Sequence, residues 1–183
     1  MNEVIKTIKQ RRSIRSFKPE QIKQEELNLI IESAIHAPSG HNTQPWHFTV
    51  IQSKAVIKHV NDISKQVMSQ SDVDWIKKSG NNPVFDITYN APTLVIVSGR
   101  KDAISWKADC SAAIQNMLLA AESLNIGSVW LGFATFGFKI NGEAEKIGIP
   151  EGYEPYYGVA LGYKKEPAPG TPKRNYDVVN YIR

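Results

Sequence analysis

The chain has 183 residues, of which 42% are hydrophobic and 22% are charged. This is the composition of an ordinary globular protein, and it excludes a disordered chain, a collagen-like repeat and a coiled coil. The length matches one domain, so we expect residues 1–183 to form a single domain. The formal net charge is +4, from 22 basic and 18 acidic residues. This imbalance is too mild for a nucleic-acid-binding protein, whose basic residues usually form a stripe.

The cysteine count and the lengths of the apolar stretches bear on the location of the protein in the cell. The single cysteine excludes a disulfide within the chain. The N-terminus lacks the apolar region of a signal peptide, and the longest uncharged stretch, 123–138, is too short to span a membrane. The four histidines lack the spacing of a metal site. We therefore expect a soluble, cytoplasmic protein without a metal, membrane or nucleic-acid partner.

Hydrophobic spacing in the first third of the chain predicts three helices and one strand. Residues 4–8 form a short helix with Asn2 as its cap. Residues 25–37 carry apolar side chains at i, i+3, i+4 and i+7, which is typical of an amphipathic helix. Strand-forming residues occupy 47–52, and Ser53 is placed to cap the next helix.

The middle of the chain predicts a buried strand and a long helix. From 66 to 90 the apolar pattern dissolves into polar residues around Trp75 and Phe85, and we interpret this stretch as a mobile excursion or lid. Residues 93–97 form a continuous apolar run, which indicates a buried strand. Residues 104–126 predict a helix that is apolar on nearly every face. A small domain can bury such a helix most simply against a second copy of itself, so we expect a homodimer.

The last third predicts two strands and an extended arm. The strands lie at 129–131 and 156–163, and a glycine-containing loop follows the first of them. Prolines force residues 167–172 into an extended segment, and 175–182 has the composition of a further strand. A proline-rich segment that leads to a lone terminal strand predicts an arm that reaches another subunit.

A cluster of basic residues follows the first predicted helix. Arg11, Arg12 and Arg15 supply three guanidinium groups, and Ser13 adds a hydroxyl. Such groups can give many charge-assisted hydrogen bonds to one phosphate. The alternative for this pentapeptide alone is an ordinary solvated basic surface.

Two further segments have the chemistry of a site for a flat, polar ligand. In 38–48, two prolines bracket a run in which the amides of Asn42 and Gln44 suit the edge of a heterocycle or a ribityl chain. In 129–133, a strand ends at Gly132, where a flat ligand can approach the backbone closely. The alternatives are an ordinary connection from helix to strand and a core strand with its turn.

Together these segments resemble the nitroreductase family of FMN-dependent oxidoreductases, in order and over essentially the whole chain. The resemblance implies an α+β fold, in which helices flank a central, mostly antiparallel sheet, and a homodimer with a domain-swapped C-terminal arm. It also implies that FMN binds non-covalently at the subunit interface. It is carried by Arg-Arg-Ser-Ile-Arg-Ser-Phe from residue 11, Ala-Pro-Ser-Gly-His-Asn-Thr-Gln-Pro-Trp-His-Phe from 37, Asn-Ala-Pro-Thr-Leu-Val-Ile-Val from 90, Leu-Asn-Ile-Gly-Ser-Val-Trp-Leu-Gly-Phe from 124, Val-Ala-Leu-Gly-Tyr from 159 and Pro-Lys-Arg from 172.

The same resemblance assigns residues to the cofactor, with one group at the phosphate and ribityl chain, one lent by the partner subunit and one under the ring. The phosphate group is Arg11, Arg12, Ser13 and Arg15 with Lys173 and Arg174 of the arm, the lent loop is Pro38, Ser39, Gly40, Asn42 and Gln44, and the ring segment is Trp130, Leu131 and Gly132. Loop positions near the expected flavin make His41, Trp75 and Phe136 candidates for the substrate pocket. The resemblance, in which an Asn before the third strand touches the ring, makes Asn81 and Asn82 candidates for that contact.

The function that the resemblance implies is reduction of nitroaromatic or quinone-like acceptors with NAD(P)H, in a ping-pong cycle of hydride transfers. No dedicated catalytic side chain is expected, because the flavin carries the redox chemistry. Two alternatives stay open at this point. One is a specialised reductive enzyme of the same fold, either dehalogenase-like or flavin-fragmenting. The other is a flavin-binding or redox-sensing module without turnover.

Overall fold

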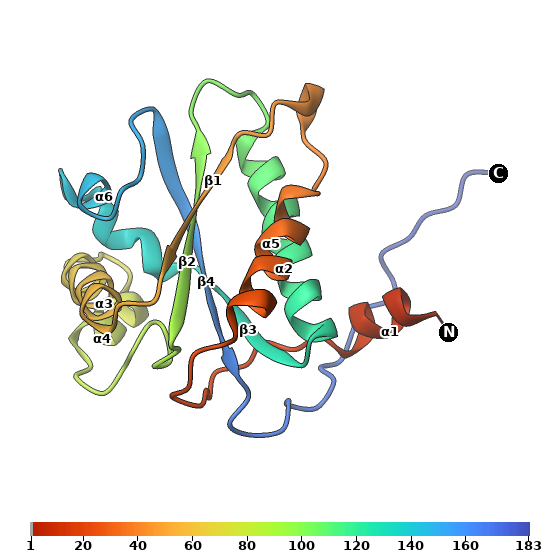
Figure 1. Cartoon of the computed structure of the whole chain (residues 1–183), viewed down its shortest axis with the longest axis horizontal. Coiled ribbons are helices and arrows are strands. Elements are labelled where there is room, and N and C mark those ends of the chain that lie inside the picture. The colour runs from red at the N-terminus through yellow and green to blue at the C-terminus, as the bar shows by residue number, and fades with distance from the viewer. Residues whose placement is uncertain (1) are drawn as a thin grey trace.

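The computed structural model describes residues 2–183, and its centre is a four-stranded antiparallel sheet (Figure 1). Every neighbouring pair of strands is antiparallel, and the order across the sheet is β1-β2-β4-β3. This confirms the expected α+β class with an antiparallel sheet. The strands are β1 (Trp46–Ile51), β2 (Thr93–Arg100), β3 (Ile126–Leu131) and β4 (Tyr153–Tyr163).

Helices cover both faces of the sheet, and Figure 1 shows them as two separate layers. One layer is α2 (Gln24–Ile35) with α5 (Trp106–Ser123), and α1 (Glu3–Gln10) lies at its end. The other layer holds α3 (Lys54–Met68), α4 (Asp74–Asn81), α6 (Glu143–Lys146) and the 3₁₀ segment η2 (Phe133–Lys139). Among residues 2–183, no helix has both the length and the apolar character needed to cross a membrane.

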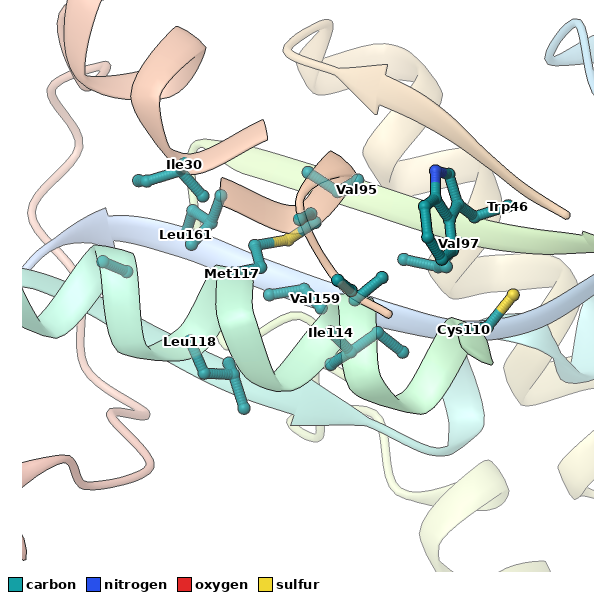
Figure 2. Packing of buried hydrophobic residues seen from close by; sticks show 14 of the residues in the cluster. Ile30, Trp46, Val95, Val97, Cys110, Ile114, Met117, Leu118, Val159 and Leu161 are labelled. Carbon is teal, nitrogen blue, oxygen red and sulfur yellow. The ribbon is translucent and has the colours of Figure 1, made fainter. Parts of the chain in front are cut away.

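The continuous apolar run of β2 is explained by its burial on both faces. Val95 and Val97 pack in the cluster on the α2–α5 side, and Leu94 and Ile96 pack in the cluster on the α3 side. Successive side chains of a strand point to opposite faces, so a strand with helices on both sides is apolar at every position. Figure 2 shows the first cluster, in which Met117 of α5 packs against the strands.

Apart from the strand expected at 175–182, the predicted helices and strands are present with small shifts at their ends. The helix expected at 25–37 spans Gln24–Ile35, and the one expected at 104–126 spans Trp106–Ser123. Ser53 caps α3 as expected, because its side chain accepts a hydrogen bond from the Val56 N–H. These elements carry their apolar residues in regular spacing, which is the signal that sequence reasoning uses best.

The interpretation of 66–90 as an excursion apart from the core was wrong. Helix α3 continues to Met68, which is fully buried, and Ile87 is buried as well. At Gly80, in α4, an added Cβ would lie 2.5 Å from the Ser69 backbone nitrogen, so α4 packs tightly on the end of α3. These contacts join residues distant in sequence, and local hydrophobic spacing does not reveal them.

The strand expected at 175–182 is absent from the described chain. Residues 167–183 have neither helix nor strand, and their side chains are exposed. A strand forms only beside another strand that shares its hydrogen bonds, and the arm runs past α1 and away from the sheet (Figure 1). Helix α5 is likewise not covered on every side within one chain, because Ala108 and Gln115 are exposed.

The free thiol of Cys110 is expected to be unreactive in the folded protein. The side chain is fully buried in α5, and this burial raises the pKa of the thiol to about 12. Thiolate is the reactive form, so its fraction at pH 8 is minute. A disulfide reagent that releases a chromophore should label no thiol in native buffer and one thiol per chain in concentrated urea. Rapid labelling of the native protein would contradict this burial.

Candidate functional site

Arg11 and Arg12 lie beyond the end of α1, and Arg174 of the C-terminal arm is near enough for its positive charge to act on Arg11. The pKa of Arg11 is held below its ordinary value, first by partial burial and then by the positive charges of Arg12 and Arg174. Glu122 opposes this shift, but its carboxylate is paired with Lys164 at 3.1 Å. Positive charge therefore gathers here against little negative charge, which is the electrostatics of an anion site.

The segment after Arg12 attaches this cluster to the free edge of the sheet. The Ile14 N–H donates to the Ser128 carbonyl oxygen at 3.0 Å, and Ser13 bridges to Ser128 in parallel. The cluster thus lies beside the first half of β3, and Gly132 follows the other end of that strand. At the rise of a strand, Ser128 and Gly132 are roughly 13 Å apart. This span suits an elongated ligand with an anionic group at one end.

Gly132 lines a hollow of about 410 Å³ between η2 and the start of β4. Its φ of −70° is open to any residue, so the backbone does not require glycine. An added Cβ would have only Tyr157 Cε1 nearby, at an ordinary contact distance of 3.8 Å. Neither the backbone conformation nor the packing requires glycine at this position. Because glycine has no side chain, the backbone here is accessible to a flat ligand. Beside it, Trp130 packs edge-on against Tyr157 and Leu131 is buried.

The loop of residues 38–44 is held in a strained shape at the start of α5. His41, Asn42 and Gln44 all have positive φ, between 44° and 54°. Such conformations persist only where the surroundings fix them, and they gather at ligand sites. Here the Asp109 carboxylate accepts hydrogen bonds from the Gly40 N–H at 3.2 Å and from the Ser105 hydroxyl at 2.8 Å.

Within one chain, this loop and the arginine cluster are far apart. Asp109, which holds the loop, lies in the first turn of α5, and Glu122, beside Arg11, lies in its last turn. About 20 Å of helix separates these two residues. Figure 1 shows the loop and α1 at opposite ends of α5. The structure thus brings together Arg11, Arg12 and Arg174, but not the loop of Pro38, Ser39, Gly40, Asn42 and Gln44.

Two of the three substrate-pocket candidates share an aromatic cluster. Trp75 lies 5.5 Å from Phe133 between ring centroids, and Phe133 lies 5.2 Å from Phe136. His41 belongs to the loop whose Gly40 is hydrogen-bonded to Asp109 of α5, and α5 lies in the helix layer on the other face of the sheet. Asn81 donates to a carbonyl of its own helix and Asn82 caps the following turn, so neither is directed to the cluster by these contacts.

Sequence reasoning missed four residues at these sites. Phe133 connects Trp75 to Phe136, and Lys139 lies 4.6 Å over the Phe136 ring and lines the hollow with it. Asp109 is a buried acid within an apolar helix, and that placement was a signal that could have been used. The sequence gives no comparable signal for Phe133 and Lys139, because their contacts form only when η2 has folded. Arg15 is directed to a fourth such residue, Tyr89, whose ring centroid lies 5.7 Å away.

Comparison with known proteins identifies the family to which this arrangement belongs. The sequence model of the Nitroreductase family matches residues 8–163, so the chain belongs to the nitroreductase family. The chain is 34% identical over 171 residues to a protein of Archaeoglobus fulgidus named for NADH dehydrogenase/NAD(P)H nitroreductase activity, with 91% of this chain and 88% of that protein aligned.

Two further relatives bear on the chemistry. A crystal structure of a nitroreductase with bound FMN from Bacteroides fragilis superposes with a TM-score of 0.92 at 35% identity, and 100% of each chain is covered. The iodotyrosine deiodinase of Thermotoga neapolitana is 28% identical over 181 residues, which cover 94% of each chain.

Proposed function

We propose that the protein binds FMN non-covalently and uses NAD(P)H to reduce nitroaromatic or quinone-like acceptors. The observation that carries this proposal is the meeting of Arg11, Arg12 and Arg174 beside β3, with open backbone at Gly132 beyond the strand. Membership of the nitroreductase family and the likeness to an FMN-bound structure support it.

The residues present fit FMN at both ends of the expected site. The Arg12 Nε is buried and has no hydrogen-bond partner among residues 2–183. Partial burial and then the positive charges of Arg12 and Arg174 lower the pKa of Arg11, so like charges lie close together here. A phosphate dianion between such groups would accept charge-assisted hydrogen bonds and offset this repulsion. At the other end, the missing Cβ of Gly132 leaves room for a ring.

The chain's own residues would bind FMN and the substrates and orient them, because FMN, when bound, would itself accept and deliver the hydride. The arginines would hold the phosphate, and N–H donors near Gly132 would stabilise negative charge that develops on the ring. Donor and acceptor would use the same pocket in turn, which gives ping-pong kinetics. The proposed cofactor residues are Arg11, Arg12, Ser13, Arg15, Pro38, Ser39, Gly40, Asn42, Gln44, Trp130, Leu131, Gly132, Lys173 and Arg174.

A homodimer would complete the site. We propose that residues 1–183 act as one domain, and that two copies pack with α5 helices antiparallel, so that the loop at 38–44 of one reaches the arginines of the other. The exposed apolar side chains of Val4, Ile5 and Ile8 on α1 support such an interface, since none is buried in the single chain. The exposed arm would then extend over the partner.

Reductive dehalogenation of an iodinated phenol is a second candidate function. The likeness to an iodotyrosine deiodinase over 94% of each chain favours it. The aromatic cluster of Trp75, Phe133 and Phe136 would suit a phenol ring as well as a nitroaromatic one.

The test begins with the absorbance spectrum of the purified, desalted protein and of the supernatant after heat denaturation. Flavin that enters the supernatant and co-migrates with FMN supports non-covalent binding. Anaerobic mixing with NADH or NADPH, followed by a nitroaromatic, a quinone or an iodinated phenol, then measures each half-reaction. Absence of flavin reduction by either nicotinamide, or reduction without reoxidation by any of these acceptors, would favour a binding module. A protein that stays colourless and takes up no added FMN would overturn the proposal.

Substitution of Gly132 by alanine tests the ring end of the site. The free energy of unfolding of the FMN-free protein is expected to stay the same or rise by up to about 1 kcal/mol, because the backbone conformation accepts alanine. FMN binding should weaken by about 1–3 kcal/mol, since the methyl group overfills the space of the ring. Urea unfolding and fluorescence titration measure the two effects. Unchanged FMN affinity would place the ring elsewhere.

A further inference from the structure

We propose that Arg12 and Thr171 form a latch that holds the C-terminal arm, so that Arg174 stays beside Arg11. In this role Arg12 is a positioning residue, which acts on the phosphate site through the arm. The proposal rests on the proposed function insofar as the latched arm serves FMN. The latch itself is a contact within the protein.

The donors of the Arg12 side chain are directed mostly at protein atoms. The residue is 8% exposed, and its Nη1 donates to the carbonyl oxygens of Lys9 and Arg11, each at 2.8 Å. Its Nη2 donates to the Thr171 hydroxyl. One planar fork thus joins the end of α1 to the arm, a geometry that a lysine ammonium cannot reproduce.

The arm has little else to hold it on the body of the protein. Its start is fixed by the Lys165 N–H, which donates to the Ser16 carbonyl oxygen at 3.1 Å, and by a 3.4 Å hydrogen bond from the Ser16 hydroxyl to Glu166. Among residues 2–183, Thr171 is the one residue beyond Glu166 with a hydrogen bond to the rest of the chain. The arm from 165 onward is exposed throughout.

The position of Arg174 therefore depends on a contact three residues before it. Three residues of chain reach at most about 10 Å, so the latch at Thr171 confines Arg174 to the neighbourhood of Arg11. Without an anion, that neighbourhood holds like charges, because the positive charges of Arg12 and Arg174 add to partial burial in lowering the pKa of Arg11. The latch opposes this repulsion and keeps the third guanidinium in place before FMN arrives, which reduces the ordering cost of binding.

The test compares Thr171→Val, which removes the hydroxyl, with Thr171→Ser, which keeps it. FMN dissociation constants are measured by fluorescence titration of the FMN-free protein. Thr171→Val should raise the dissociation constant about three- to tenfold, the effect of one net hydrogen bond, whereas Thr171→Ser should stay near wild type. In an Arg174→Ala background, Thr171→Val should have little further effect, because the latch acts through Arg174. Equal effects of Thr171→Val in both backgrounds, or no effect in either, would overturn the proposal.

A second readout follows the latch without FMN. Trypsin cleaves after Lys173 and Arg174, and Thr171→Val should speed this cleavage in the FMN-free protein, while Thr171→Ser should leave its rate unchanged. Equal cleavage rates for wild type and Thr171→Val would overturn the latch. If the wild-type protein takes up no FMN but Thr171→Val still speeds cleavage, the proposed function fails and the latch stands.

Discussion

Replacing Arg11 with alanine should weaken FMN binding by about 1.5–3 kcal/mol, the usual range for a hydrogen bond to a charged group. Arg11 is the half-buried member of the cluster, and its pKa is lowered first by this burial and then by the charges of Arg12 and Arg174. Its loss removes both a donor and the charge at the centre of the proposed phosphate site. Fluorescence titration of the FMN-free variant with FMN measures the effect.

Two controls separate the phosphate contact from a general loss of positive charge. Lys9→Ala removes one charge from the exposed last turn of α1 and should leave FMN affinity close to wild type. Riboflavin lacks the phosphate, so its affinity should be the same for Arg11→Ala and wild type. An Arg11→Ala protein that binds FMN as tightly as wild type would show that the phosphate lies elsewhere.

Replacing Asp109 with alanine should cost about 3 kcal/mol of unfolding free energy, because a buried carboxylate loses two hydrogen bonds worth about 1.5–3 kcal/mol each and its own burial cost is relieved. The residue is 5% exposed and holds the strained loop through Gly40. It also lies in the first turn of α5, where negative charge is favourable. Urea unfolding of the FMN-free protein measures the loss.

The same variant should bind FMN more weakly, since in the proposed dimer its loop is the part that each subunit lends to the other site. Ser105→Ala removes one of the two hydrogen bonds and should show a smaller loss of stability. Asp102→Ala removes an exposed carboxylate paired with Arg100 and serves as the matched control. Wild-type stability in Asp109→Ala would show that the loop is held by other contacts.

The regular elements and the family were predictable from the sequence because their signals are local. The spacing of apolar residues in 25–37 and the continuous run at 93–97 predicted α2 and β2 to within a few residues. Helix α4 was missed, because it is polar in local pattern and its place depends on Gly80 meeting the end of α3. Contacts of this kind exist only once the chain has folded.

The candidate site was predictable as residue types but not as an arrangement. The arginines at 11–15 and the glycine at 132 can be recognised in the sequence as candidate site residues from their chemistry alone. The role of Arg12 does not, because the sequence cannot show that its guanidinium faces Lys9 and Thr171. Nor does the sequence show that the arm lacks a strand partner within its own chain, since pairing depends on where neighbouring strands lie.

The separation of the loop and the arginines at opposite ends of α5 has a genetic consequence. In the proposed dimer, each site draws its arginines from one chain and its loop from the other. A mixed dimer of Arg11→Ala and Asp109→Ala chains would place both defects in one site and leave the other wholly wild type. Two impaired proteins that are unfolded and refolded together in equal amounts should then recover about one quarter of the wild-type sites, as random pairing gives. Two defective copies of this gene in one cell should therefore complement each other.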